Sequence, residues 1–284
     1  MVRFIFLVGV LFASLTNSLS QERALLYEIS GNELAQPSYL FGTFHLLCES
    51  DFILSDSLKN KFQKSEQLVL ELDMDDPNMM MAMMKGIKMK GDTTLKNLFS
   101  DSDYSYLNQY FSDSLRMSLK MMENIKPFML YSLMIPSLLD CPVVAFEMEL
   151  TSLAKKQNKE ILGLESFEFQ MEIFDAISYN KQAEYLLGSI KDSKSSKLEL
   201  QKLLKVYLSK DLNELEKAIG DSDKMFKDFE DILLKKRNED WLSKIMNFAI
   251  QKPTFFAVGA GHLAGKNGII NLLKKQGYGV KVIE

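Results

Sequence analysis

Two short stretches near opposite ends of the chain end in the same way, and they constrain the fold more than any other feature. Residues 38–46 read SYLFGTFHL, and residues 253–265 read PTFFAVGAGHLAG. Each contains an apolar run typical of a buried strand, then a glycine, then a histidine at the third position after that glycine. His45 and His262 are the only two histidines in the sequence. The pattern predicts two buried strands that each deliver an imidazole at the carboxyl end.

Two imidazoles at strand ends indicate a site if the strands are neighbours. In open α/β sheets, sites form in the crevice outside the carboxyl ends of the strands. Imidazole binds divalent ions well, and a carboxylate would complete a site that leaves positions open for water. The alternative is that each histidine only caps its strand end through a hydrogen bond. The matched pair favours the metal site, with His45 and His262 as ligands.

Three glutamates near element ends are candidates for the carboxylate. Residues 67–72 (QLVLEL) read as a buried strand, and Glu71 lies at its carboxyl end. Glu147 begins an expected helix, and Glu165 follows an expected strand. Each has an alternative role as a solvated strand end, a helix cap or a surface charge. Glu71 comes one helix after His45, so it is the preferred partner.

The first residues have the pattern of a secretory signal peptide. Arg3 precedes an apolar stretch from Phe4 to Leu15, and small residues follow at Ser18 and Ser20. The stretch of about 12 residues is too short to span a bilayer about 30 Å thick, and no second long apolar run follows. An uncleaved N-terminal anchor is the alternative. We expect export to the periplasm or the extracellular medium, with no integral membrane segment after cleavage.

The composition is that of a globular protein. With 46% hydrophobic and 25% charged residues, the chain can build one large core. We therefore expect a signal peptide at residues 1–20 and a single domain at residues 21–284, which includes a helical insertion. The 34 basic residues are interspersed among 38 acidic ones, for a net charge of −4. This gives no basic surface for nucleic acid, so we expect no such partner.

Cys48 and Cys141 are the only cysteines. Disulfides persist in exported proteins, and a bridge would tie the segment after His45 to the middle of the chain. Free thiols and a metal thiolate are the alternatives, but no CxxC spacing supports the latter. We expect the bridge.

Periodicity predicts the remaining elements. Leu25–Ser30 and Tyr39–Phe44 flank a Gly31-Asn32 turn and read as an antiparallel hairpin. Asp192–Lys197 reads as a solvated linker inside a long charged helical region. Further helices are expected at 53–65, 92–139, 147–156, 167–177 and 265–276, and further strands at 160–164 and 278–283.

Met74–Met89 holds seven methionines, and Asp76-Pro77 predicts the start of a helix there. Methionines usually fill adaptable apolar faces, so a core helix or a lid near the site is expected. A promiscuous peptide-binding surface and a soft-metal site are the alternatives. The helical spacing favours the first interpretation.

Five segments together resemble one known family. They are YLFGTFH, VLELD, GLES with Gln170 after it, RNEDW, and FFAVGAGHLAGKNGIINLLKKQGYGV. The chain is similar in these segments to the TraB/GumN family, which is related to the Tiki metalloproteases. The resemblance runs from Leu25 to Ile283. It implies an α/β fold with a mixed sheet and flanking helices.

The resemblance also implies a site. It places a divalent ion on His45, His262 and Glu71, with manganese, cobalt or zinc as the candidate metals. The GLES segment adds Glu165 and the RN pair adds Arg237. The sequence departs from the family pattern at Ser166, where the family has threonine, and at Lys236, where an acidic residue is common.

Two functions fit these features. The first is a metal-dependent hydrolase, most simply a peptidase acting on a peptide or protein. Glu147 or Glu165 would then be the general base or acid, and Arg237 would stabilise an oxyanion or bind a substrate carboxylate. The second is an exported protein that binds a peptide, haem or a metal without turnover. An inactive family member kept for its surface is a third interpretation.

The signal peptide yields the first testable prediction. We expect cleavage after Ser20, because a signal peptidase accepts small residues at Ser18 and Ser20. Intact mass measurement of the exported protein checks this, and a mass that still includes residues 1–20 would contradict it.

Overall fold

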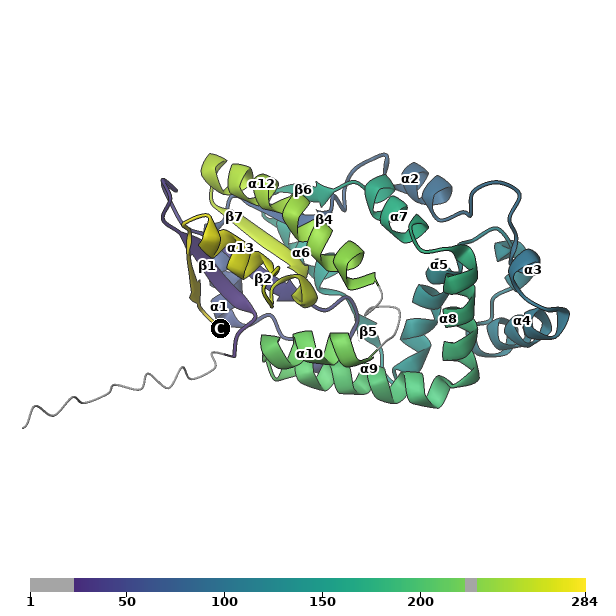
Figure 1. Ribbon diagram of the computed structural model, residues 1–284. Coiled ribbons are helices and arrows are strands. Elements are labelled where there is room, and N and C mark those ends of the chain that lie inside the picture. The colour runs from purple at the N-terminus through teal and green to yellow at the C-terminus, as the bar shows by residue number, and fades with distance from the viewer. Residues whose placement is uncertain (1–22, 223–228) are drawn as a thin grey trace, which may run out of the picture.

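A computed structural model describes residues 23–222 and 229–284. Its centre is a mixed sheet in the strand order β6-β4-β7-β2-β1-β8 (Figure 1). The six strands are β1 Leu26–Ser30, β2 Ser38–Thr43, β4 Gln67–Leu72, β6 Glu160–Glu165, β7 Thr254–Gly259 and β8 Gly279–Val282. The predicted α/β fold with a mixed sheet is confirmed. The expected signal peptide at residues 1–20 lies outside the described residues.

The four strands β6, β4, β7 and β2 are parallel to one another. β1 is antiparallel to both β2 and β8, which confirms the predicted hairpin. β7 therefore lies directly beside β2, and Thr43 pairs with Gly259. Because parallel strands end at the same edge, the two Gly-x-x-His motifs meet there.

Helices cover both faces of the sheet, which is why its strands are continuous apolar runs. Phe255 and Ala257 of β7 face one layer, and Phe256 and Val258 face the other. The first layer contains α1 Asp56–Lys64, α6 Phe146–Lys156, α9 Ser193–Leu208 and α10 Leu212–Ser222. The second contains α12 Lys236–Gln251 and α13 Ile269–Lys275.

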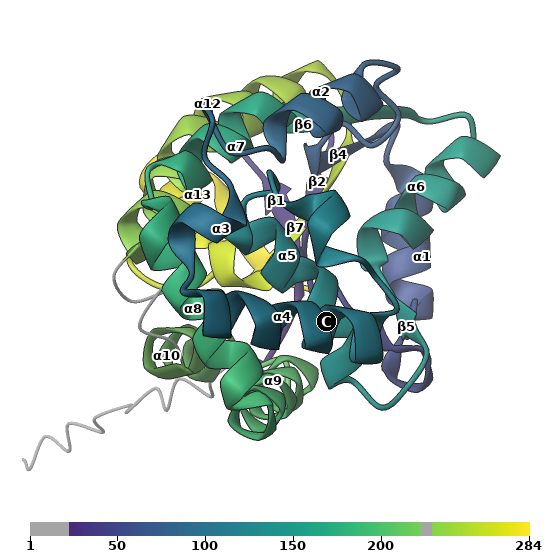
Figure 2. The same cartoon turned by 90° about the vertical axis from the view of Figure 1, so that its right-hand side faces the viewer.

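A further group of helices has its own buried cluster, centred on Leu107, Phe111, Leu130 and Leu186. It is the expected helical insertion, and Figure 2 shows α3, α4, α5 and α8 together on the side that faces the viewer. Its helices are α3 Leu95–Leu98, α4 Asp101–Leu115, α5 Pro127–Met134 and α8 Tyr179–Lys191, with α2 Met79–Gly86 and α7 Phe167–Asp175 packed against each other nearby. The described chain also has five short helical turns: η1 Glu49–Asp51, η2 Leu119–Met122, η3 Ile135–Leu138, η4 Asp231–Lys235 and η5 Ala260–His262.

The linker predicted at Asp192–Lys197 is wrong. Asp192 caps α9, because its carboxylate accepts a hydrogen bond from the Ser195 N–H, and the serines and lysines form the first turns of that helix. Aspartate is a strong N-cap residue. The polar stretch at residues 192–197 is therefore the start of a helix and not a break between helices.

The methionine helix differs from its prediction in two ways. It begins at Met79 instead of at Pro77, because the carboxylates of Asp73 and Asp76 bond to backbone N–H groups just before it and hold a turn. Four of its methionines are also exposed by 41–69%, so they do not fill the core: Met80, Met81, Met83 and Met84.

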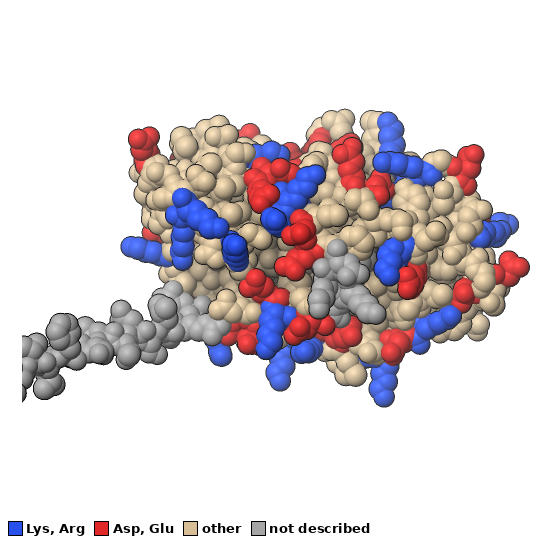
Figure 3. Space-filling model, viewed as in Figure 1, with Lys and Arg blue, Asp and Glu red and all other residues tan. Residues whose placement is uncertain are grey.

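Charged side chains of both signs alternate over the face in Figure 3. Exposed ion pairs such as Lys181–Glu184 contribute about 0–1 kcal/mol each, so the two layers and the helical cluster carry most of the stability. Within residues 23–222 and 229–284, no helix is long and apolar enough to cross a membrane.

Cys48 and Cys141 form the expected disulfide, with a Cα–Cα distance of 5.5 Å. It joins β3 Leu47–Cys48 to the segment before β5 Val143–Val144, which together form a small second sheet.

The bridge closes a loop with a sequence separation of 93. We expect Cys48→Ser/Cys141→Ser to lower the free energy of unfolding by about 2–5 kcal/mol, because the unfolded chain regains the entropy that the long loop removes. Denaturant unfolding of the oxidised protein and the variant measures this. Equal midpoints and slopes would contradict it.

Candidate functional site

The carboxyl ends of the four parallel strands bring the predicted residues together. β2 ends at Thr43, two residues before His45, and β7 ends at Gly259, with His262 in η5 directly after it. Glu71 is near the end of β4, and β4 is the other neighbour of β7. Glu165 ends β6. The structure thus brings these side chains to one edge of the sheet.

Three of the side chains face the bare Cα of Gly259. A Cβ atom at this position would lie 3.3 Å from Glu71 Oε1, 3.7 Å from His45 Nε2 and 3.7 Å from His262 Cδ2. The Gly259 N–H also donates to Glu71 Oε1 at 2.8 Å. The second glycine motif thus leaves room for the histidine of the first.

Gly42, in the first motif, likewise leaves room for residues of the second motif. A Cβ atom on Gly42 would lie 3.0 Å from the Leu263 side chain and 3.1 Å from Ala260 Cβ. Glycine therefore lets η5 lie against β2. Neither glycine needs a left-handed backbone, since the positive-φ residues are elsewhere in the described chain. Close approach is the reason for both.

Arg237 is the buried centre of the site. Its Nε and Nη2 donate to the two oxygens of Glu165 at 3.1 and 2.7 Å, and Nη2 also donates to Glu71 Oε2 at 2.5 Å. Its Nη1 donates to His262 Nε2 at 3.0 Å and to the Leu233 carbonyl at 3.2 Å. A guanidinium has five N–H donors, and these contacts occupy all of them. In this arrangement Arg237 therefore has no free N–H for the predicted contact with a substrate.

α12 positions the surroundings of Arg237. Trp241, one helical turn later, stacks under the guanidinium at 4.6 Å and donates from Nε1 to Glu165 Oε2 at 2.9 Å. Gln170 donates to Glu165 Oε1 at 3.0 Å. The Glu165 side chain is only 1% exposed, and burial raises its pKa against the effect of these donors. Glu165 thus holds Arg237 in place and is closed to solvent.

His262 has a fixed tautomer. Asn238 Nδ2 donates to the carbonyls of His262 and Asn267, so its Oδ1 faces His262 Nδ1 at 2.7 Å and accepts the proton there. The lone pair on Nε2 accepts from Arg237. Burial, with the nearby positive charge of Arg237, lowers the pKa of His262 to about 3, although Glu71 opposes this. The imidazole is therefore neutral at pH 7.

His45 is held from its other nitrogen. Its Nδ1 lies 3.1 Å from Glu147 Oε1, and the Thr43 hydroxyl donates to the same oxygen at 2.6 Å. Desolvation lowers the pKa of His45, but the hydrogen bond and charge of Glu147 outweigh it and raise the pKa overall. The His45 side chain is 68% exposed, so solvent reaches its proton. Glu147 is thus the partner that orients His45.

Glu71 is ionised. Burial raises the pKa of this carboxyl, but the charge of Arg237 leads the opposing interactions and brings it well below its usual range. Its Oε1 lies 3.8 Å from His262 Nε2. As the side chains stand, no group of three or more His, Cys, Asp and Glu residues in the described chain is arranged to hold a metal ion. The lone pair of His262 Nε2 also accepts a hydrogen bond from Arg237 Nη1.

Asn238, Trp241 and Thr43 are the contributors whose roles were not predicted. A signal existed for each. Asn238 directly follows Arg237, and Trp241 lies four residues after it on the same helix face. Thr43 is two residues before His45, which is the spacing for one face of an extended chain.

Arg237 is expected to be essential for stability. Arg237→Met leaves Glu71 and Glu165 buried without a cation, which should cost about 3–5 kcal/mol of unfolding free energy. Lys252→Met breaks the more exposed pair with Glu160 and should cost less than about 1 kcal/mol. Urea unfolding measures both, and equal losses would contradict the central role of Arg237.

His262 is expected to make stability depend on pH. Its folded pKa of about 3 lies below the unfolded value of about 6.5, so the unfolded chain binds the extra proton between these limits. Its contribution is complete above about pH 6.5 and falls by about 1.4 kcal/mol for each pH unit as acid is added.

Unfolding at pH 7 and pH 5 tests this in the wild type and in His262→Asn. The pH-dependent loss should be smaller in the variant, whatever its overall stability. An identical loss in both proteins would remove His262 as the cause.

A model of the TraB/PrgY/gumN family matches residues 25–282. No curated protein and no solved structure matches the chain. The matched range includes both glycine–histidine motifs, the three glutamates of the site and Arg237. The chain therefore belongs to the TraB/PrgY/gumN family.

Proposed function

We propose that this protein is an exported metal-dependent hydrolase that cleaves peptide bonds. The observation that carries the proposal is the convergence of His45, His262 and Glu71 on the bare Cα of Gly259. Two imidazoles and a carboxylate are the donor set of many catalytic metal sites.

The charges of the site support a divalent ion. Glu71 and Glu165 pair with the guanidinium of Arg237, and Glu147 pairs with His45. The formal charge of these five groups is −2 if His45 and His262 are neutral. A proton on His45 reduces this to −1, whereas a divalent ion in its place gives zero. Buried charges are stable when they are compensated, so the exchange of this proton for an ion is favoured.

The donor atoms are of the type that such an ion binds. His45 Nε2, Glu71 Oε1 and His262 Nε2 would hold manganese, cobalt or zinc, and the ion would lower the pKa of a bound water so that it attacks a carbonyl. For His262 to take part, Arg237 Nη1 must release Nε2. Arg237 keeps its two bonds to Glu165 in that case, so the guanidinium stays charged and paired.

The chain's own residues have separate tasks in this proposal. Glu147 orients His45 through Nδ1, and Asn238 fixes the tautomer of His262, which are the usual second contacts of metal-binding imidazoles. Glu147 is also the more accessible of the two carboxylates proposed for proton transfer, at 15% exposure against 1% for Glu165. We therefore assign the general acid or base role to Glu147.

Peptide substrates and export have separate support. Peptides are the substrates of the Tiki proteases, to which the family is related. α2, which carries the exposed methionines, begins seven residues after β4 ends, and methionine surfaces suit varied apolar side chains. The Cys48–Cys141 disulfide favours an oxidising compartment, in agreement with the expected signal peptide.

Calorimetric titration of manganese, cobalt and zinc tests the ligands. We expect His45→Ala, His262→Ala and Glu71→Gln each to weaken binding at least tenfold, and pairs of them to be non-additive because one loss already opens the site. Glu160→Gln, at the exposed start of β6, is the matched control and should bind as the wild type does. Wild-type affinity in His45→Ala would contradict the two-histidine site.

Turnover is tested with the loaded protein and unstructured peptides of mixed sequence. Cleavage that depends on the ion and is lost in Glu147→Gln supports the hydrolase. Tight ion binding without cleavage of any peptide would instead support the non-catalytic binding protein.

A further inference from the structure

The small sheet of β3 and β5 contains Cys48 of the disulfide, and β3 begins two residues after His45. It is antiparallel, and the Glu49 N–H extends it by one bond to the Pro142 carbonyl at 2.9 Å. Its two residue pairs are Leu47 with Val144 and Cys48 with Val143.

When the register of this ladder is continued by two residues, it reaches residues of the site. In an antiparallel ladder, each step back along one strand is a step forward along the other. Two steps from the Leu47–Val144 pair lead to His45 on one side and to Phe146 on the other. Glu147 is the next residue after Phe146. The ladder therefore brings the His45 segment alongside the start of α6, where His45 Nδ1 lies 3.1 Å from Glu147 Oε1.

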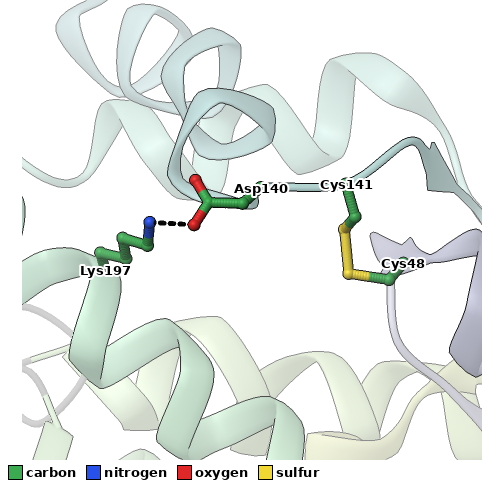
Figure 4. Close-up of a disulfide and its surroundings, with 4 residues drawn as sticks. All are labelled: Cys48, Asp140, Cys141 and Lys197. Atoms are coloured by element: carbon green, nitrogen blue, oxygen red, sulfur yellow. Dashed lines mark hydrogen bonds and ion pairs between the residues drawn. A yellow bond between two sulfur atoms is a disulfide. The ribbon is translucent and has the colours of Figure 1, made fainter.

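The ladder is too short to be stable alone. Two-stranded sheets are marginal in water even when they are longer. Val143 is 36% exposed, and of the four paired residues only Leu47 is buried. The covalent bond between Cys48 and Cys141 is thus the strongest tie between these two segments, and Figure 4 shows it spanning them.

We propose that the Cys48–Cys141 disulfide is a positioning device for His45. It holds the His45 segment against the start of α6 so that Nδ1 stays on Glu147 and Nε2 stays directed at Gly259. This inference rests on the proposed function only in treating His45 as a working residue of the site. Its role differs from the general stabilisation that any long-loop disulfide gives.

The two bonds to Glu147 distinguish these roles. Thr43 reaches Glu147 from β2, which is anchored in the main sheet by β1 and β7. His45 lies in the connection between β2 and β3 and depends on the small sheet. Loss of the disulfide should therefore release His45 from Glu147 and leave Thr43 on it.

NMR of the metal-free protein tests this prediction. With only two histidines in the chain, the ring protons of His45 and His262 are readily assigned. In Cys48→Ser/Cys141→Ser, we expect the nuclear Overhauser contact between the His45 ring and Glu147 to be lost. The Thr43–Glu147 contact and the signals of His262 should remain. A His45–Glu147 contact of unchanged intensity would overturn the proposal.

Two control variants distinguish a loss of His45 positioning from a general loss of stability. Leu107→Ala removes a fully buried side chain of the helical insertion and destabilises the protein far from His45. Lys197→Gln breaks the ion pair with Asp140, next to Cys141 (Figure 4). Both should keep the His45–Glu147 contact. Its loss in Leu107→Ala would assign the effect to stability and overturn the proposal.

If the double serine variant does not fold, the folded wild type treated with a dithiol supplies the same comparison. The dithiol gives two electrons and two protons to the bridge, which becomes two thiols, and is itself oxidised to a disulfide.

Manganese affinity provides a second measurement. Loss of a group that orients a ligand typically weakens metal binding about 10–100-fold, so we expect at least a tenfold loss in the serine variant and no loss in Lys197→Gln. A wild type that binds no manganese, cobalt or zinc would refute the proposed metal site, whereas the NMR comparison would still decide the role of the disulfide. Unchanged affinity in the serine variant of a binding wild type would count against the positioning role.

Discussion

The buried guanidinium of Arg237 is the interaction on which the rest of the site depends. It joins side chains from β4, β6 and η5, and all five of its N–H groups are used. Without a cation at this point, the carboxyls of Glu71 and Glu165 would both have higher pKa values, because Arg237 lowers the pKa of each against the effect of burial. Burial first, and then the same guanidinium, lower the pKa of His262, and Arg237 Nη1 donates to its Nε2. One side chain thus lowers the pKa of three others.

The features that could be predicted from the sequence have local signals. The apolar runs, the glycines and the two histidines identified β2 and β7 and the edge at which they end. The disulfide was expected from having two cysteines in a chain whose first residues have the pattern of a signal peptide. These predictions succeeded because a buried parallel strand has a composition of its own and because its carboxyl end is the usual place for a site.

The features that could not be predicted depend on contacts between distant residues. Nothing near Glu147 in the sequence indicates that it meets His45, since the register of a two-pair ladder brings them together. The contacts that leave Arg237 without a free N–H come from strands and turns far apart in the chain. Asp192 was missed for a different reason, since a cap residue in a polar stretch looks like the polar residues of a linker.

The place of β7 in the sheet has a consequence for how the molecule forms. β7 is the penultimate strand in the chain order, yet it lies between β4 and β2, which both come from the first 72 residues. Until residues 254–259 join the sheet, β2 and β4 each have an unpaired edge and do not pair with each other. The sheet, the meeting of the two histidines and the burial of Arg237 must therefore be late events. Such long-range pairing makes folding slow, because the entropy of closing a long loop is lost before the distant strands pair.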